Sequence, residues 1–119
     1  MIRYKKQEVN FLNNQFYDIN EVCTMLGTTS RTLRFYEEKG IIESTKIKNS
    51  KRRQYTKEQI QHIRNVIVLR TLGLSIKTIS EIQQQNNDLK QTIITKRAEI
   101  IASIESKRKE INLLNEALA

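Results

Sequence analysis

Residues 28–40 read Thr-Thr-Ser-Arg-Thr-Leu-Arg-Phe-Tyr-Glu-Glu-Lys-Gly, and this stretch decides the fold. It predicts a short helix that begins at a Thr or Ser and ends at Gly40. With Leu33 turned inward, the helical period turns Arg31, Phe35 and, less squarely, Arg34 outward. Arginine donates two hydrogen bonds through a planar fork, which suits guanine edges and phosphates. The stretch is therefore a candidate DNA-reading helix.

Another short amphipathic helix is predicted immediately before it. Asp18 or Asn20 can cap this helix, Glu21 follows Asp18 at capping-box spacing, and Gly27 ends it. Two such helices joined by a tight turn form a helix-turn-helix, whose second helix can enter a DNA major groove. The first helix has a buried stripe at i, i+3, i+4 and i+7, which consists of Ile19, Val22, Cys23 and Leu26.

A basic β-hairpin is predicted after the reading helix. The pair Ile41-Ile42 can begin a strand, and Arg53-Gln54-Tyr55 can return it. Between them, residues 46–53 contain five cations in eight residues, with Asn49-Ser50 near the tip. A wing of this kind would neutralise phosphates on either side of a groove, with little dependence on sequence and strong dependence on salt. The alternative interpretation is a solvated loop.

Two more helices are predicted to close a small core over the first pair. Thr56 and Gln59 have capping-box spacing at the start of the longer one, and Gly73 ends it. Ser75 can cap the next, shorter helix. The lone histidine, His62, lies off the apolar face of its helix and is interpreted as exposed and inert. The residues predicted to face inward are Ile60, Ile63, Val66, Ile67, Leu69, Ile76, Ile79 and Ile82.

From about Asp88 onward the pattern changes to one long helix without Gly or Pro. Its apolar residues follow alternating steps of three and four, and Arg97 and Lys107 occupy two of the expected seam positions. Such a stripe cannot be buried by one helix alone, so we expect it to pair with a second chain. The pattern does not separate parallel from antiparallel pairing. The expected dimerisation residues are Leu89, Ile93, Ile100, Ile104, Ile111, Leu114 and Leu118.

Charge and composition narrow the class of protein. The chain of 119 residues has a formal charge of +8 and no proline. Residues 31–64 hold ten Lys or Arg against four acidic residues, whereas residues 65–119 hold eight against six. A basic surface concentrated around the reading helix suggests double-stranded DNA as partner. The single cysteine, Cys23, excludes an internal disulfide and a multi-thiolate metal site, and we interpret it as a core residue.

Other function classes are disfavoured. No apolar run approaches the roughly 18 residues that cross a bilayer, and the N-terminus lacks the apolar segment of a signal peptide, so a cytoplasmic protein without membrane contact is expected. The sequence shows no phosphate-binding glycine loop, nucleophile motif or paired acid and base. We therefore expect neither an enzyme nor a cofactor or metal site.

At this point the chain resembles the MerR family of bacterial transcription regulators. The resemblance covers roughly residues 16–83, and it rests on residues 17–22, 28–42, 52–56 and 72–76 in this order and spacing. It implies a mainly α-helical fold with a winged helix-turn-helix head, and a homodimer formed through an antiparallel coiled coil. It also implies binding to a two-fold promoter site in the bacterial nucleoid. Family members often distort an over-long promoter spacer so that RNA polymerase, a further expected partner, can use it.

Site residues follow from combining the resemblance with the helix and wing patterns. Phe35 stands where many relatives have tyrosine, so a hydroxyl contact there is lost, and Lys51 stands where many have glycine. Tyr36 is expected either in the core or at a phosphate. The expected DNA-binding residues are Thr29, Ser30, Arg31, Thr32, Arg34, Phe35, Tyr36, Lys46, Lys48, Lys51, Arg52, Arg53 and Tyr55.

The predicted organisation has three parts. Residues 1–15 form an N-terminal arm, residues 16–85 the DNA-binding head, and residues 86–119 the dimerisation helix. Residues 84–119 contain none of the cysteines that metal-sensing relatives carry, which disfavours thiolate sensing. The chain ends just past the coil, so it is either a fragment or a protein without its own effector domain. Two alternatives stay open: an architectural DNA-organising protein with the same head, and a coiled-coil adaptor whose basic head is incidental.

Overall fold

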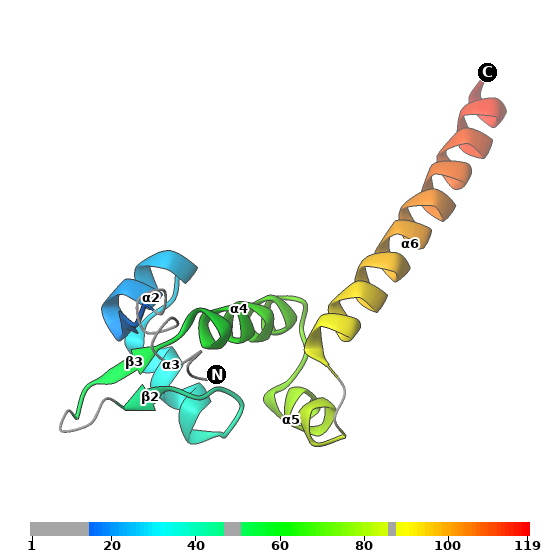
Figure 1. The fold of residues 1–119 in the computed structure, drawn as a ribbon. Helices are drawn as coiled ribbons and strands as arrows, with labels where there is room; N and C mark the ends of the chain where they lie inside the picture. The colour runs from blue at the N-terminus through cyan, green and yellow to red at the C-terminus, as the bar shows by residue number, and fades with distance from the viewer. Residues whose placement is uncertain (1–14, 47–50, 86–87) are drawn as a thin grey trace.

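The computed structural model describes residues 15–46, 51–85 and 88–119. A compact head is followed by one long helix that projects away from it, with overall extents of 72 × 31 × 29 Å (Figure 1). The predicted fold class, a mainly α winged helix-turn-helix with a long C-terminal helix, is confirmed. The elements are β1 (Tyr17–Asp18), α2 (Ile19–Leu26), α3 (Ser30–Glu38), β2 (Thr45–Lys46), β3 (Arg53–Tyr55), α4 (Lys57–Thr71), α5 (Ile76–Gln84) and α6 (Leu89–Leu118).

The wing belongs to a three-stranded antiparallel sheet with strand order β1-β3-β2. Tyr17 pairs with Tyr55, and Lys46 pairs with Arg53. The prediction that a strand begins at residues 41–42 was wrong. Both isoleucines are buried in the loop after α3, whereas a strand would turn successive side chains to opposite faces. The predicted tip at residues 49–50 lies outside the described residues, as do residues 1–14 of the predicted arm.

The helices begin where the cap residues predict. Asp18 and Glu21 form a reciprocal capping box at α2, with hydrogen bonds of 2.8 and 2.9 Å. Thr56 and Gln59 do the same at α4. Gly27 has φ 66°, the left-handed conformation that glycine adopts without steric cost, and this lets the chain reverse sharply between α2 and α3. These local signals fix the angle of entry of each helix.

The head core is built around α4. Its inward face belongs to a cluster that also contains side chains from α2, α3, α5, strands β1 and β3, and the loop after α3. The prediction that Leu89 belongs to the dimer seam was wrong, because this side chain is only 3% exposed and lies in the same core. Ile93 also packs partly against the head. The first turn of α6 therefore completes the head.

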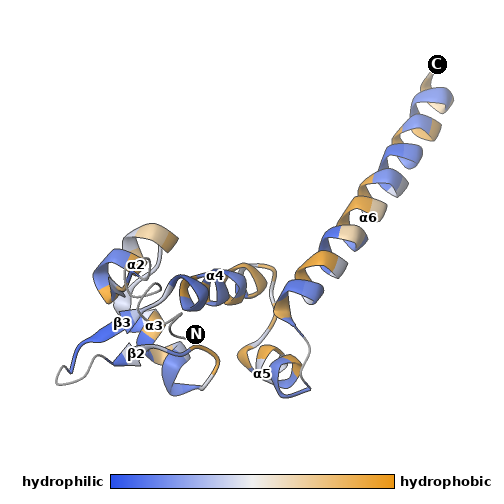
Figure 2. Cartoon of the chain, viewed as in Figure 1, coloured by the Kyte–Doolittle hydropathy of each residue, from blue (hydrophilic) through white to orange (hydrophobic). Residues whose placement is uncertain are grey.

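From Ile94 onward, the large apolar side chains of α6 are exposed. Ile100, Ile104, Ile111, Leu114 and Leu118 are between 48% and 86% exposed. Figure 2 shows apolar and polar segments alternating along the projecting helix. An exposed apolar stripe on a projecting helix is typical of surfaces through which helices pair.

Candidate DNA interface

The outer face of α3 presents the side chains predicted to read DNA. Arg31 and Arg34 are exposed, and Phe35 is 42% exposed with the Lys39 ammonium 5.5 Å from the centre of its ring. Thr29 is the N-cap of the helix, and its hydroxyl oxygen accepts a hydrogen bond from the Thr32 amide at 3.1 Å. The two arginines are therefore displayed by a helix whose start is fixed.

The two tyrosines in the predicted set lie in the core. The Tyr36 ring is buried against the head, which favours the core over the phosphate for this residue. Tyr55 is fully buried, and its hydroxyl oxygen has no hydrogen-bond partner among the described residues. Burial, together with the Glu37 carboxylate, raises the pKa of Tyr55 above its usual 10.0. The prediction that Tyr55 contacts DNA was therefore wrong, because its hydroxyl cannot reach a ligand outside the core.

The wing cations fall into two groups. Lys46 and Lys51 are exposed at the two sides of the wing, and Lys48 lies outside the described residues. Arg52 and Arg53 each have an acidic partner. An Arg52 Nη2 nitrogen lies 3.6 Å from Asp18, and Arg53 Nε donates to a Glu37 carboxylate oxygen at 3.1 Å.

The reading helix and the wing meet in one place. Arg34 from α3 lines a hollow of about 330 Å³ together with Lys51, Arg52 and Arg53 from the wing. Asp18, the N-cap of α2, lines the same hollow. Four cations converging from two elements produce a local positive potential that suits a phosphate backbone.

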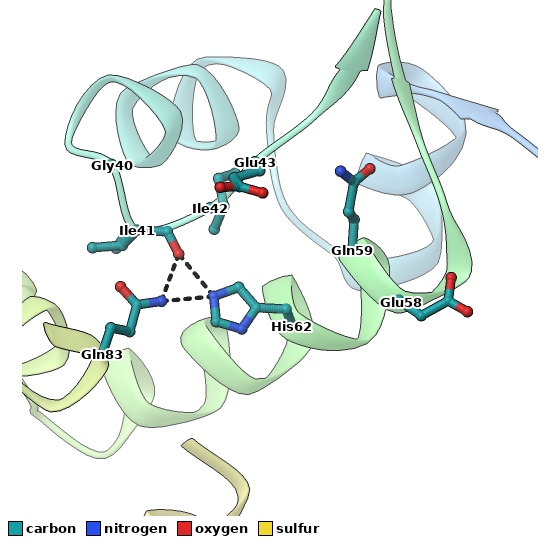
Figure 3. A pocket seen from close by; sticks show the side chains of 8 residues that line it. All are labelled: Gly40, Ile41, Ile42, Glu43, Glu58, Gln59, His62 and Gln83. Atoms are coloured by element: carbon teal, nitrogen blue, oxygen red, sulfur yellow. Dashed lines mark hydrogen bonds between the residues drawn. The ribbon is translucent and has the colours of Figure 1, made fainter. Parts of the chain in front are cut away.

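A polar contact behind the interface ties the end of the reading helix to the rest of the head. Gln83 Nε2 donates to the Ile41 carbonyl at 3.0 Å, and His62 Nε2 lies 2.8 Å from both that oxygen and the Gln83 nitrogen (Figure 3). These groups line a pocket of about 450 Å³ with Glu43 and Glu58. The prediction that His62 is exposed was wrong, since its ring fixes the loop after α3 against α4 and α5.

Cys23 is partly buried beside the core, in line with its place on the apolar stripe. Burial raises the pKa of its thiol above the usual 9.0, although Arg34 acts in the opposite direction. A raised pKa leaves little thiolate at neutral pH, so the group is a weak nucleophile. Over the described ranges, no group of three or more His, Cys, Asp or Glu side chains is placed to hold a metal ion. Within the same ranges, no helix has the length and apolar character of a membrane span.

A helix-turn-helix with exposed arginines and a basic wing defines a class of DNA-binding protein. Comparison with known proteins identifies the family: residues 17–86 match the model of the MerR HTH family of regulatory proteins, and the chain belongs to that family. It is a DNA-binding transcription regulator rather than an enzyme.

Individual relatives agree with this assignment. The chain is 32% identical over 110 residues to the uncharacterised HTH-type transcriptional regulator YyaN of Bacillus subtilis, covering 80% of each protein. It is 39% identical over 64 residues to the regulator AdhR of the same organism, covering 54% of this chain and 46% of AdhR. The fold matches that of HiNmlR, described as a MerR family regulator lacking the sensor domain bound to promoter DNA. That match has a TM-score of 0.61, 19% identity, and coverage of 88% and 89% of the two chains.

Sequence reasoning missed the acidic partners of the wing. Asp18 was recognised only as a cap, and Glu37 only as a helix residue. Glu37 is 16 positions away from Arg53, and no periodicity links a helix residue to a strand residue at that separation. Their pairing depends on how the sheet packs against α3.

Proposed function

We propose that this regulator acts as a homodimer on a two-fold promoter site, with α3 in the major groove of each half-site and the wing along the flanking backbone. The observation that carries the proposal is the shared hollow between Arg34 of α3 and the wing cations Lys51 and Arg52. Side chains proposed to read bases and side chains proposed to neutralise phosphates thus line the same hollow. The proposed contacts are Thr29, Ser30, Arg31, Thr32, Arg34 and Phe35, together with Lys46, Lys48, Lys51 and Arg52.

The dimer is proposed to form through α6. The exposed stripe of Ile100, Ile104, Ile111, Leu114 and Leu118 is the surface that a second copy would cover. A parallel pair in register would place each seam residue opposite its own copy, so that Arg97 met Arg97 and Lys107 met Lys107. In an antiparallel pair each cation can lie opposite an apolar position instead, which supports the orientation that the family resemblance implies.

Action at the promoter is proposed to follow from two-fold binding. A dimer that holds two half-sites can bend and untwist the spacer between them, and the deformation changes how RNA polymerase meets the promoter elements. Support for this step comes from membership of the family, in which such distortion is common.

Selection from a random duplex pool tests the proposal. The selected duplex should contain a two-fold site that binds one dimer by analytical ultracentrifugation, with affinity that falls steeply between about 50 and 200 mM salt. Transcription from a promoter with this site should then change when the protein is added. Selection without any sequence preference would reject the proposed two-fold promoter site. A bound site with unchanged transcription would favour the architectural alternative.

A further inference from the structure

A half-buried ion pair joins the recognition helix to the wing. Arg53 Nε of β3 lies 3.1 Å from a Glu37 carboxylate oxygen of α3, and the two side chains are 31% and 25% exposed. Ion pairs at the open surface contribute little, but partial burial reduces screening and strengthens a direct N–H···O contact. The neighbouring arginine differs, since the Arg52 side chain is 72% exposed and its nitrogen lies 3.6 Å from Asp18.

The positions of both residues suit a structural tie. Glu37 lies in the last turn of α3, where the helix dipole disfavours a carboxylate unless a cation compensates it. Arg53 pairs with Lys46 at the outer end of the β2–β3 ladder, where the wing leaves the sheet. The contact therefore connects the C-terminal end of the reading helix to the root of the wing.

We propose that Arg53 is a positioning residue that acts through Glu37, and that it does not contact a DNA phosphate. The pair fixes the wing relative to α3, so that Lys46 and Lys51 reach the phosphates that flank the bases read by Arg31 and Arg34. This inference rests on the proposed function, and it departs from the sequence prediction that Arg53 is a wing contact.

Salt dependence separates a positioning residue from a phosphate contact. Each phosphate neutralised by a cation adds about 0.9 to the slope of log affinity against log salt concentration. Removing a phosphate-contacting arginine therefore lowers the slope. Removing a positioning arginine weakens binding and leaves the slope nearly unchanged.

The test uses the full chain with Arg53→Gln, Glu37→Gln and both changes together, and the selected duplex as probe. We expect each single variant to lose about fivefold in affinity per protomer, and thus about 25-fold for a dimer. The double variant should be no weaker than the singles, because both lose the same contact. Ethylation interference should show the native contacts along both the wing and α3, because Lys46 and Lys51 still reach the same phosphates once the wing is ordered on DNA.

Two control variants show what loss of a phosphate contact and loss of a remote charge look like in the same measurements. Lys51→Gln should lower the salt slope by about one per protomer, as a phosphate contact does. Lys109→Gln, an exposed change on α6, removes one charge far from the wing and should alter neither affinity nor footprint. Circular dichroism at the binding temperature confirms that each variant is folded. Should a variant unfold, the exchanged pair Glu37→Arg with Arg53→Glu should recover affinity relative to either single exchange.

Two outcomes would overturn the inference. A slope for Arg53→Gln that falls as it does for Lys51→Gln would make Arg53 a phosphate contact. Tighter binding by Glu37→Gln would mean that the carboxylate merely holds an arginine back from DNA. Both measurements can also be made on a random duplex, so failure to find a selected site would reject the proposed function without deciding the role of Arg53.

Discussion

The Tyr55 side chain makes both a favourable and an unfavourable contribution to the stability of the fold. Its ring is fully buried in the head core, while its hydroxyl oxygen is buried without a partner among the described residues. A buried polar group without a hydrogen bond costs about 1–3 kcal/mol. The ring is needed for packing, and the oxygen is not.

Tyr55→Phe should therefore raise the free energy of unfolding by about 1 kcal/mol at neutral pH. The pKa of Tyr55 is raised above 10.0 in the folded state, so the unfolded chain loses this proton first as the pH rises. The native chain should lose stability above pH 10, and the variant should lose less. Urea unfolding at neutral and alkaline pH measures both effects.

Tyr17→Phe is the matched control, because the Tyr17 hydroxyl already donates to Gln15 at the exposed end of β1. It should leave the free energy of unfolding at neutral pH nearly unchanged. A Tyr55→Phe variant that is less stable than the native chain would show that the hydroxyl has a partner in solution.

Arg34 and Lys51 should respond differently to truncation, since Arg34 lies on the helix that we propose for the major groove and Lys51 lies on the wing. Arg34→Ala should cost about 1–3 kcal/mol of binding and relax the choice of base at one position of each half-site. Lys51→Ala should weaken binding evenly across sequences and lower the salt slope. Site selection repeated with each variant distinguishes the two roles. The reverse pattern would mean that Lys51 reads bases and Arg34 contacts phosphates.

At the scale of elements, α6 has the most to gain from a partner. Replacing both Ile100 and Ile104 with Gln should yield monomers by sedimentation, with much weaker binding to the two-fold site, because the stripe loses its central apolar layers. The head should keep its helical signal. Ala102→Gln with Ser106→Gln, which lies off the stripe, should remain dimeric, and an unchanged dimer in the first variant would reject α6 as the interface.

Elements with local signals were predictable, and contacts between elements were not. The caps Asp18, Thr56 and Ser75 act within three residues of themselves, so spacing alone reveals them. Ile41 was predicted to lie in a strand because a buried loop position requires an apolar residue just as a buried strand position does. His62 resembled a surface residue because its partners, the Ile41 carbonyl and Gln83, come from distant segments.

In the candidate site, too, local features were predictable from the sequence and contacts between elements were not. The outward face of α3 was predictable from the helical period once Leu33 was placed inside. Tyr55 was misplaced because the wing motif does not say which face of β3 meets the core. The ion pairs of Arg52 and Arg53 required the packing of the sheet against α2 and α3 to be known.

At the scale of the whole molecule, α6 divides into a start that packs on the head and a remainder whose apolar side chains are exposed. Leu89→Ala should destabilise the head by about 2–5 kcal/mol, since it removes a buried side chain from the shared core. Leu118→Ala, at the far end of the helix, should leave the head unchanged. Urea unfolding of the monomeric Ile100→Gln/Ile104→Gln background separates head stability from dimer stability. If Leu89→Ala affected head stability as little as Leu118→Ala, no part of α6 would belong to the head.

The uncovered stripe on α6 also determines how the regulator would respond to its own abundance. If operator binding requires two chains to associate first, occupancy at low concentration rises with the square of the chain concentration. A modest change in synthesis or degradation of the protein then produces a disproportionate change at the promoter. For the proposed dimer, gene dosage itself becomes a control signal, set by how tightly those isoleucines and leucines hold two copies together.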